Sequence, residues 1–73
     1  MQDEIARRIS AAWPDAQVEV QIDGNRALIV VTSGHFDGLS RVARQQAVYA
    51  FVEDMIADGR LHAVTIRASV PNA

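Results

Sequence analysis

Residues 17–31 combine two different hydrophobic patterns on either side of one turn. Val18, Val20 and Ile22 alternate strictly with polar residues, which predicts a strand with one buried side and one side facing solvent. Asp23–Gly24 follows at once and is a strong hairpin signal, because both central positions of such a turn need a positive φ. The returning run at residues 27–31 is apolar throughout, as expected for a strand at the sheet centre or covered on both sides. These residues predict an antiparallel hairpin.

A first helix is expected before this hairpin. Asp3 can cap its N-terminus, and Pro14 with Asp15 would end it. Apolar residues recur along it with helical spacing, and the largest of them, Trp13, is expected to close the hydrophobic core. The members of this stripe are Ile5, Ile9, Ala12 and Trp13.

A second, longer helix and a last strand are expected after the hairpin. Residues 33–38 have the composition of a loop, Ser40 can cap the helix that follows, and Gly59 would supply a left-handed stop. Asp54 and Asp58 share one face of this helix, where they are expected only to aid solubility. Residues 62–69 predict the last strand. The positions expected to face the core from the long helix are Val48, Tyr49, Phe51, Val52, Met55 and Ile56.

The order of these elements is α-β-β-α-β within a single domain, residues 1–73. It predicts an α+β fold in which two helices pack on one face of a three-stranded mixed sheet. The last strand would reach the sheet by a helical crossover and would therefore run parallel to its neighbour.

Composition restricts the chemistry that the chain can perform. It has no cysteine and two histidines, so a metal would have to bind through imidazole, through carboxylate or through a partner. The residues form no nucleophile triad, phosphate-binding loop or catalytic carboxylate pair, which predicts a protein that is not an enzyme. The acidic start at residues 1–4 and the lack of a long apolar run predict a cytoplasmic location without a membrane segment.

Three stretches resemble the BolA family, and within it the IbaG/YrbA-like branch. Phe36–Tyr49 reads Phe-Asp-Gly-Leu-Ser-Arg-Val-Ala-Arg-Gln-Gln-Ala-Val-Tyr, and Ile56–Val64 reads Ile-Ala-Asp-Gly-Arg-Leu-His-Ala-Val. Val70–Pro71 completes the match. The resemblance covers nearly the whole chain and implies a BolA-like, KH-like fold.

The resemblance also implies a function and its site. It implies a non-enzymatic adaptor in iron-sulfur cluster assembly, trafficking or iron sensing, acting with a monothiol glutaredoxin through a bridging 2Fe-2S cluster. His62 matches the family's iron ligand at the start of the last strand. Arg26 stands where relatives carry a loop histidine, and arginine has no lone pair to donate to iron. Asp23 is left as a weak second ligand, so the cluster would be shared with the partner and the chain alone would bind none.

Two other functions stay open. The KH-like fold is compatible with a DNA- or RNA-binding stress-response regulator of transcription. Arg26, His35, Arg41 and Arg44 are candidate residues for contact with a protein partner or with nucleic acid. A KH loop has the pattern Gly-x-x-Gly, however, and the segment from Gly34 to Gly38 is one residue longer. We predict instead that Arg41 and Arg44 dock an acidic or polar protein surface. A cluster-free interaction module is the third possibility, and a homodimer also stays open.

Overall fold

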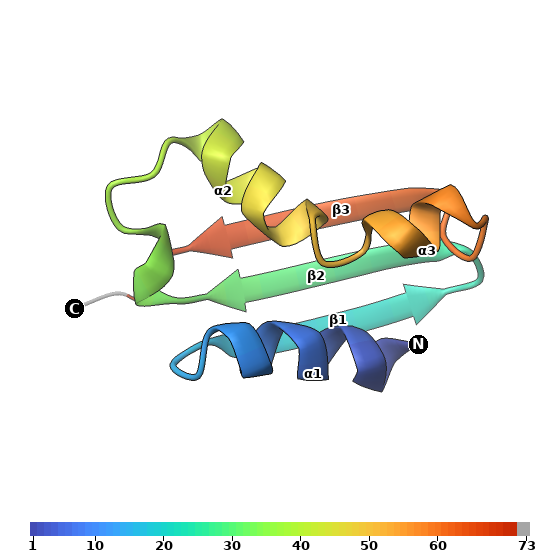
Figure 1. Cartoon of the computed structure of the whole chain (residues 1–73), viewed down its shortest axis with the longest axis horizontal. Helices are drawn as coiled ribbons and strands as arrows, with labels where there is room; N and C mark the ends of the chain where they lie inside the picture. Colours follow the sequence, from blue (N-terminus) through green and yellow to red (C-terminus); the bar gives the residue numbers. More distant parts are fainter. Residues whose placement is uncertain (72–73) are drawn as a thin grey trace.

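Three strands form one mixed sheet in the order β1-β2-β3 (Figure 1). The structure is a computed structural model and describes residues 1–71. Strands β1 and β2 are antiparallel, whereas β3 runs parallel to β2, which confirms the predicted hairpin and crossover. The elements are α1 (Gln2–Ala12), β1 (Gln17–Asp23), β2 (Arg26–Thr32), the short 3-10 helix η1 (Gly34–Phe36), α2 (Arg41–Tyr49), α3 (Glu53–Ala57) and β3 (Ala63–Ser69).

The turn of the hairpin lies one residue later than predicted. Asp23 pairs with Arg26, so the two central turn residues are Gly24 and Asn25. Gly24 has φ 60°, and none of the non-glycine residues up to position 71 has a positive φ. The expectation of two left-handed central residues at Asp23–Gly24 is therefore wrong. A left-handed glycine followed by an ordinary residue is the pattern of a type II′ turn, which also matches the twist of the strands.

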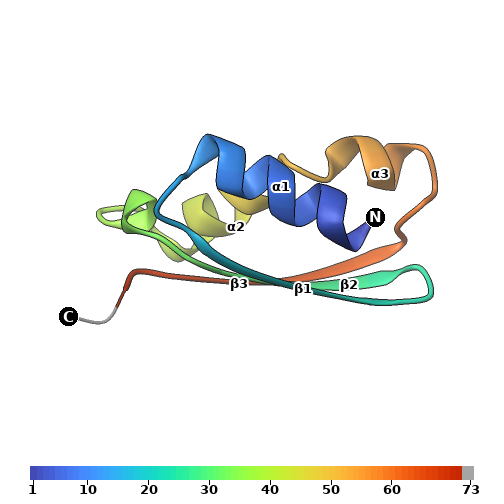
Figure 2. The ribbon, with the colours of Figure 1, turned by 90° about the horizontal axis from the view of Figure 1, so that it is seen from below.

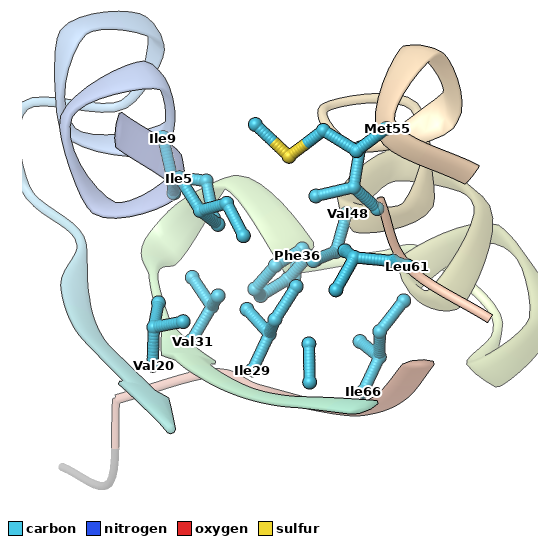
Figure 3. Close-up of a cluster of buried hydrophobic side chains, with 12 residues drawn as sticks. Ile5, Ile9, Val20, Ile29, Val31, Phe36, Val48, Met55, Leu61 and Ile66 are labelled. Carbon is cyan, nitrogen blue, oxygen red and sulfur yellow. The ribbon is translucent and has the colours of Figure 1, made fainter. Parts of the chain in front are cut away.

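All the helices lie on one face of the sheet, and the opposite face is open to solvent (Figure 2). The alternating side of β1 supplies part of the sheet side of the core. Central strand β2 adds Ala27, Ile29 and Val31, whereas Leu28 and Val30, on its other face, are only partly buried. Of the two arrangements expected for β2, the structure shows the strand at the sheet centre, with helices on one face only. None of the helices within residues 1–71 is both long and apolar enough to cross a membrane. Figure 3 shows helix residues Ile5, Ile9, Val48 and Met55 above sheet residues Val20, Ile29, Val31 and Ile66, with Phe36 and Leu61 completing the cluster.

The aromatic residues Phe36 and Trp13 meet at one end of the core. Phe36, placed in a loop by its composition, has no exposed surface and lies in the core. Trp13 is only half-buried, and it packs edge-to-face against Phe36 and Phe51 with ring centroids 5.2 and 4.9 Å apart. Ala12 is exposed, so the predicted stripe of the first helix reaches the core mainly through its two isoleucines. Trp13 thus covers one end of the core, which agrees with the expectation that it closes the core.

The predicted long helix is broken into α2 and α3. At the break, the amide of Phe51 donates to the Val48 carbonyl at 3.1 Å and that of Val52 donates to Tyr49 at 3.0 Å, both over three residues. Val52 has φ −121°, outside the helical range. The Arg8 guanidinium on α1 donates to the Phe51 carbonyl at 2.8 Å. Arg8 therefore donates to the carbonyl that the break leaves without a helical partner.

Arg8 also joins α1 to α3 through ion pairs. Its two terminal nitrogens donate to the two carboxylate oxygens of Asp54 at 2.8 and 3.1 Å, and it pairs with Glu4 within α1. Arg60 bonds to Asp58 at 2.8 Å and to Asp54 at 3.3 Å. The hydrogen bond from Arg8 is the main cause that lowers the pKa of Asp54. The expectation that Asp54 and Asp58 only aid solubility is wrong, because both hold basic side chains.

Of the predicted helix ends, those at Ser40 and Gly59 are confirmed and the one at Asp3 is wrong. Ser40 caps α2, and its Oγ accepts from the amide of Ala43 at 3.1 Å. Gly59 has φ 86° and follows the last turn of α3, as its left-handed stop requires. Asp3 is not the cap of α1, because the helix begins at Gln2 and Asp3 lies in its first turn. Its charge there suits the positive end of the helix dipole.

Candidate functional site

His62 is an exposed residue whose backbone is held firmly in place. Its amide donates to the carbonyl of Asn25, in the hairpin turn, at 2.8 Å. The preceding Leu61 has no exposed surface, and its amide bonds to the carbonyl of Met55 at 3.0 Å. Strand β3 begins at Ala63, one residue later than predicted, so His62 lies in the connection just before it. The fold thus presents the imidazole to solvent from an anchored backbone.

The hairpin end and His62 come together at one edge of the molecule. Arg26 is paired with Asp23 on one side and with Ala63, the neighbour of His62, on the other. Side chains alternate along strands, so these three paired residues share a row on the open face of the sheet. Asp23 and Arg26 are both exposed. The structure therefore brings the three residues predicted around the ligand position, His62, Asp23 and Arg26, into one surface region.

This region does not form a metal site by itself. His62 offers one imidazole, and the guanidinium of Arg26 cannot act as a ligand. No group of three or more His, Cys, Asp or Glu side chains suited to holding a metal occurs in residues 1–71. A cluster with four protein ligands therefore does not fit this chain alone, and the donor set fits only a share of a site whose other ligands come from a partner.

His35 lies far from His62. It belongs to η1, after the end of β2, whereas His62 lies before the start of β3, which is parallel to β2 (Figure 1). Seven-residue strands separate the two ends of the sheet, a span of roughly 20 Å. The ring of His35 is stacked on Trp13 with centroids 4.5 Å apart and planes inclined by 22°. The two histidines of the chain cannot share one metal ion.

Asp15 fixes the loop that carries His35. Its carboxylate accepts from the amide of Gly34 at 2.8 Å and from the buried hydroxyl of Ser33 at 2.9 Å. The amide of His35 in turn donates to the Ser33 oxygen at 3.1 Å. The Gly34 amide, followed by the Ser33 hydroxyl, holds the pKa of Asp15 below its ordinary value of 3.8. The ionised form of Asp15 therefore stabilises this end of the fold.

Acid is expected to weaken the fold through Asp15. Because the folded pKa lies below 3.8, the stabilisation is complete above that value and is lost as the pH falls through the folded pKa. Urea unfolding across the acid range should show a shallower decline of stability with falling pH for Asp15→Asn than for the wild type. Ser33→Ala, which removes only one donor, should lie between them. Equal slopes for all three proteins would contradict this role.

The two arginines of α2 differ in their exposure to solvent and in their hydrogen bonds. Arg44 is half-buried, and its Nε donates to the carbonyl of Leu39 at 3.1 Å. Arg41 is exposed and makes no side-chain hydrogen bond or ion pair within the part of the chain that the structure describes.

Two hydrophobic residues of α2 are also exposed. Tyr49, expected to face the core, is 39% exposed. Val42 is 64% exposed, and the sequence does not single it out because an apolar residue in a helix is usually assigned to the core.

Comparison with known proteins agrees with this architecture. A model of the family described as BolA-like protein matches residues 17–73. The chain is 44% identical over 69 residues to the acid stress protein IbaG of Escherichia coli strain K12, a match covering 94% of this chain and 82% of the relative. It is 41% identical over 66 residues to a protein encoded in the rpoN-murA intergenic region of Acinetobacter guillouiae, covering 90% and 80% of the two chains.

Solved structures show the same fold. BolA1 from Arabidopsis thaliana superposes with a TM-score of 0.84 at 18% identity, covering 96% of this chain and 90% of that one. The BolA domain of SufE1 from the same plant gives a TM-score of 0.83 at 23% identity, covering 96% and 91%. These matches confirm the predicted α+β arrangement. With the family match across most of its length, the chain belongs to the BolA-like protein family.

Proposed function

We propose that this protein is a non-enzymatic, cytoplasmic adaptor that shares a 2Fe-2S cluster with a monothiol glutaredoxin in iron-sulfur cluster assembly, trafficking or iron sensing. The observation that carries the proposal is the exposed imidazole of His62 on a backbone pinned by the Asn25 carbonyl. A ligand that a partner must reach has to be accessible and correctly placed before the partner arrives, because ordering it on binding would reduce the affinity.

The chemistry of the region suits a shared cluster. Imidazole is a ligand for iron, and histidine ligands raise the reduction potential of a 2Fe-2S cluster relative to thiolates alone. The chain has no cysteine, so the thiolates would come from the glutaredoxin and from glutathione. Arg26 and Asp23 would border the shared site, with Asp23 as a weak oxygen ligand.

A second candidate is a DNA- or RNA-binding stress-response regulator. It is favoured by the relative named acid stress protein and by the exposed Arg41 on α2, which forms no ion pair within residues 1–71. The arrangement around this helix gives it less support, because Gly34 and Gly38 are one residue too far apart for a KH phosphate loop. Of the two arginines on α2, Arg44 is also less available to nucleic acid, because its side chain bonds to the Leu39 carbonyl.

Mixing the apo protein with a cluster-loaded monothiol glutaredoxin should distinguish the two candidates. The adaptor predicts a changed visible circular dichroism spectrum at a one-to-one ratio, because a histidine ligand alters the environment of the iron. Titration of the apo protein with duplex DNA and with RNA, at several salt concentrations, serves as the parallel arm. Salt-dependent nucleic-acid binding together with an unchanged cluster spectrum would favour the regulator.

A further inference from the structure

The outer face of α2 carries two large apolar side chains where a solvent-facing helix is normally polar. Val42 and Tyr49 are 64% and 39% exposed, and they are two of the three large hydrophobic residues left exposed within residues 1–71. They lie seven residues apart, which is two helical turns, so their side chains line the same ridge. Gln46, also exposed, lies between them and carries no charge. We call Val42, Gln46 and Tyr49 the α2 ridge.

The α2 ridge lies on a different side of the helix from Val48, which packs on the protein. Val48 is fully buried beneath α2, and Gln45 reaches down to donate to the carbonyl of Ile66 on β3 at 2.8 Å. These contacts fix the rotation of the helix about its axis. The ridge is therefore held outward by the fold and is not an apolar surface that a small rotation of the helix would bury.

The charged residues of the segment that contains the α2 ridge are all basic, with Asp37 and Glu53 just outside it. Residues 38–52 contain Arg41 and Arg44 and no carboxylate, although the whole chain has a net charge of −2. Arg41 is exposed and forms no ion pair in the described structure, so its charge remains available to a partner. A second copy of the chain would bring the same two arginines and no acidic residue from this segment. Charge complementarity thus favours an acidic partner over self-association.

We propose that the α2 ridge binds an acidic, amphipathic helical segment of a partner protein. Apolar side chains of that segment would cover Val42 and Tyr49, its carboxylates would pair with Arg41, and the Tyr49 hydroxyl would stay at the wet rim. The α2 helix begins near the end of the sheet that carries η1, whereas His62 lies beyond the opposite end of the strands (Figure 1). The ridge is therefore separate from the His62 region, and one molecule can occupy both surfaces at once.

The test uses the full-length apo protein and a synthetic helical peptide with leucine along one face and glutamate along the other. Backbone amide shifts in NMR titrations should change along residues 41–50 and leave the His62 region unaffected. Val42→Gln/Tyr49→Gln should weaken binding about tenfold, since buried apolar side chains at an interface centre carry most of its affinity. Arg41→Gln should weaken it about threefold and reduce its salt dependence.

Two substitutions away from the α2 ridge serve as controls. Met1→Gln alters the other large exposed hydrophobic residue, 42% exposed, and should bind like the wild type. His62→Ala should also bind unchanged, so a failure of the iron-related proposal would not affect this one. Every residue substituted in the test and its controls is exposed, and unchanged urea midpoints would show that the fold is intact.

Several results would overturn the proposal. Equal binding of a scrambled peptide, or of a peptide with lysine in place of glutamate, would show that the surface does not select acidic amphipathic helices. Shifts that map outside α2, or no binding by the wild type, would do the same. Concentration-dependent shifts of the free protein at the α2 ridge would assign the surface to self-association, and stronger binding of duplex DNA at the same residues would assign it to nucleic acid.

Discussion

Phe36→Ala is expected to lower the free energy of unfolding by about 3–5 kcal/mol, the usual cost of truncating a fully buried phenylalanine. Phe36 has no exposed surface and lies where η1 meets the helices and the sheet (Figure 3). Its removal would leave a cavity between Trp13, which packs against its ring, and the residues of the central strand. The neighbouring Ser33 and Asp15 contacts hold η1 in place, so the backbone cannot easily collapse into that space.

A loss of this size is large for a domain of 73 residues. Total stabilities are about 5–15 kcal/mol and lie toward the low end in small domains, so the variant is expected to be partly unfolded at room temperature. Urea unfolding followed by far-ultraviolet circular dichroism would measure the change. Tyr49→Ala is a matched control, because it truncates a partly exposed aromatic residue and should cost about 1 kcal/mol or less. Similar midpoints for Phe36→Ala and Tyr49→Ala would contradict the assignment of Phe36 to the core.

His62→Ala is expected to abolish the visible circular dichroism signal of the mixed complex with a cluster-loaded glutaredoxin. The imidazole is the one strong nitrogen ligand that this region of the chain offers, so no neighbouring side chain can replace it. The apo fold should remain, because His62 is exposed and the buried contacts beside it come from Leu61 and Ile66. His35→Ala is the matched control, since it removes the other histidine at the opposite end of the sheet and should leave the spectrum unchanged.

Arg26→His tests the same site by a gain of function. The change places an imidazole on the strand position paired with Ala63, next to His62, where the family resemblance implies a ligand. It should slow the loss of the cluster from the mixed complex several-fold, because a second nitrogen donor replaces a side chain that cannot ligate iron. If His62→Ala and Arg26→His both behaved like the wild type, iron ligation by this protein would be ruled out and the cluster-free interaction module would become the better interpretation.

The sequence contains the local signals for most of the elements but not for the break in the long helix. Alternation at Val18, Val20 and Ile22 and the cap at Ser40 act over a few residues, and the structure confirms both. No proline or glycine near Tyr49 indicates the break that follows it. It is held by the Arg8 side chain, which comes from 43 residues away and bonds to the Phe51 carbonyl. A helix pattern cannot reveal an end that a distant residue stabilises.

The candidate site also has one part that the sequence predicts and one part that depends on the tertiary structure. His62 can be picked out from its motif, but its proximity to the hairpin turn follows from the parallel register of β2 and β3, which pairs Arg26 with Ala63. The exposure of the α2 ridge was likewise not predictable, because Val42 and Tyr49 are residue types that usually lie in the core. The sequence alone determined the family resemblance, the α+β order and the ligand candidate, since these depend on local pattern. The tertiary structure decided which residues meet and which side chains remain exposed, because both depend on contacts between segments far apart in the chain.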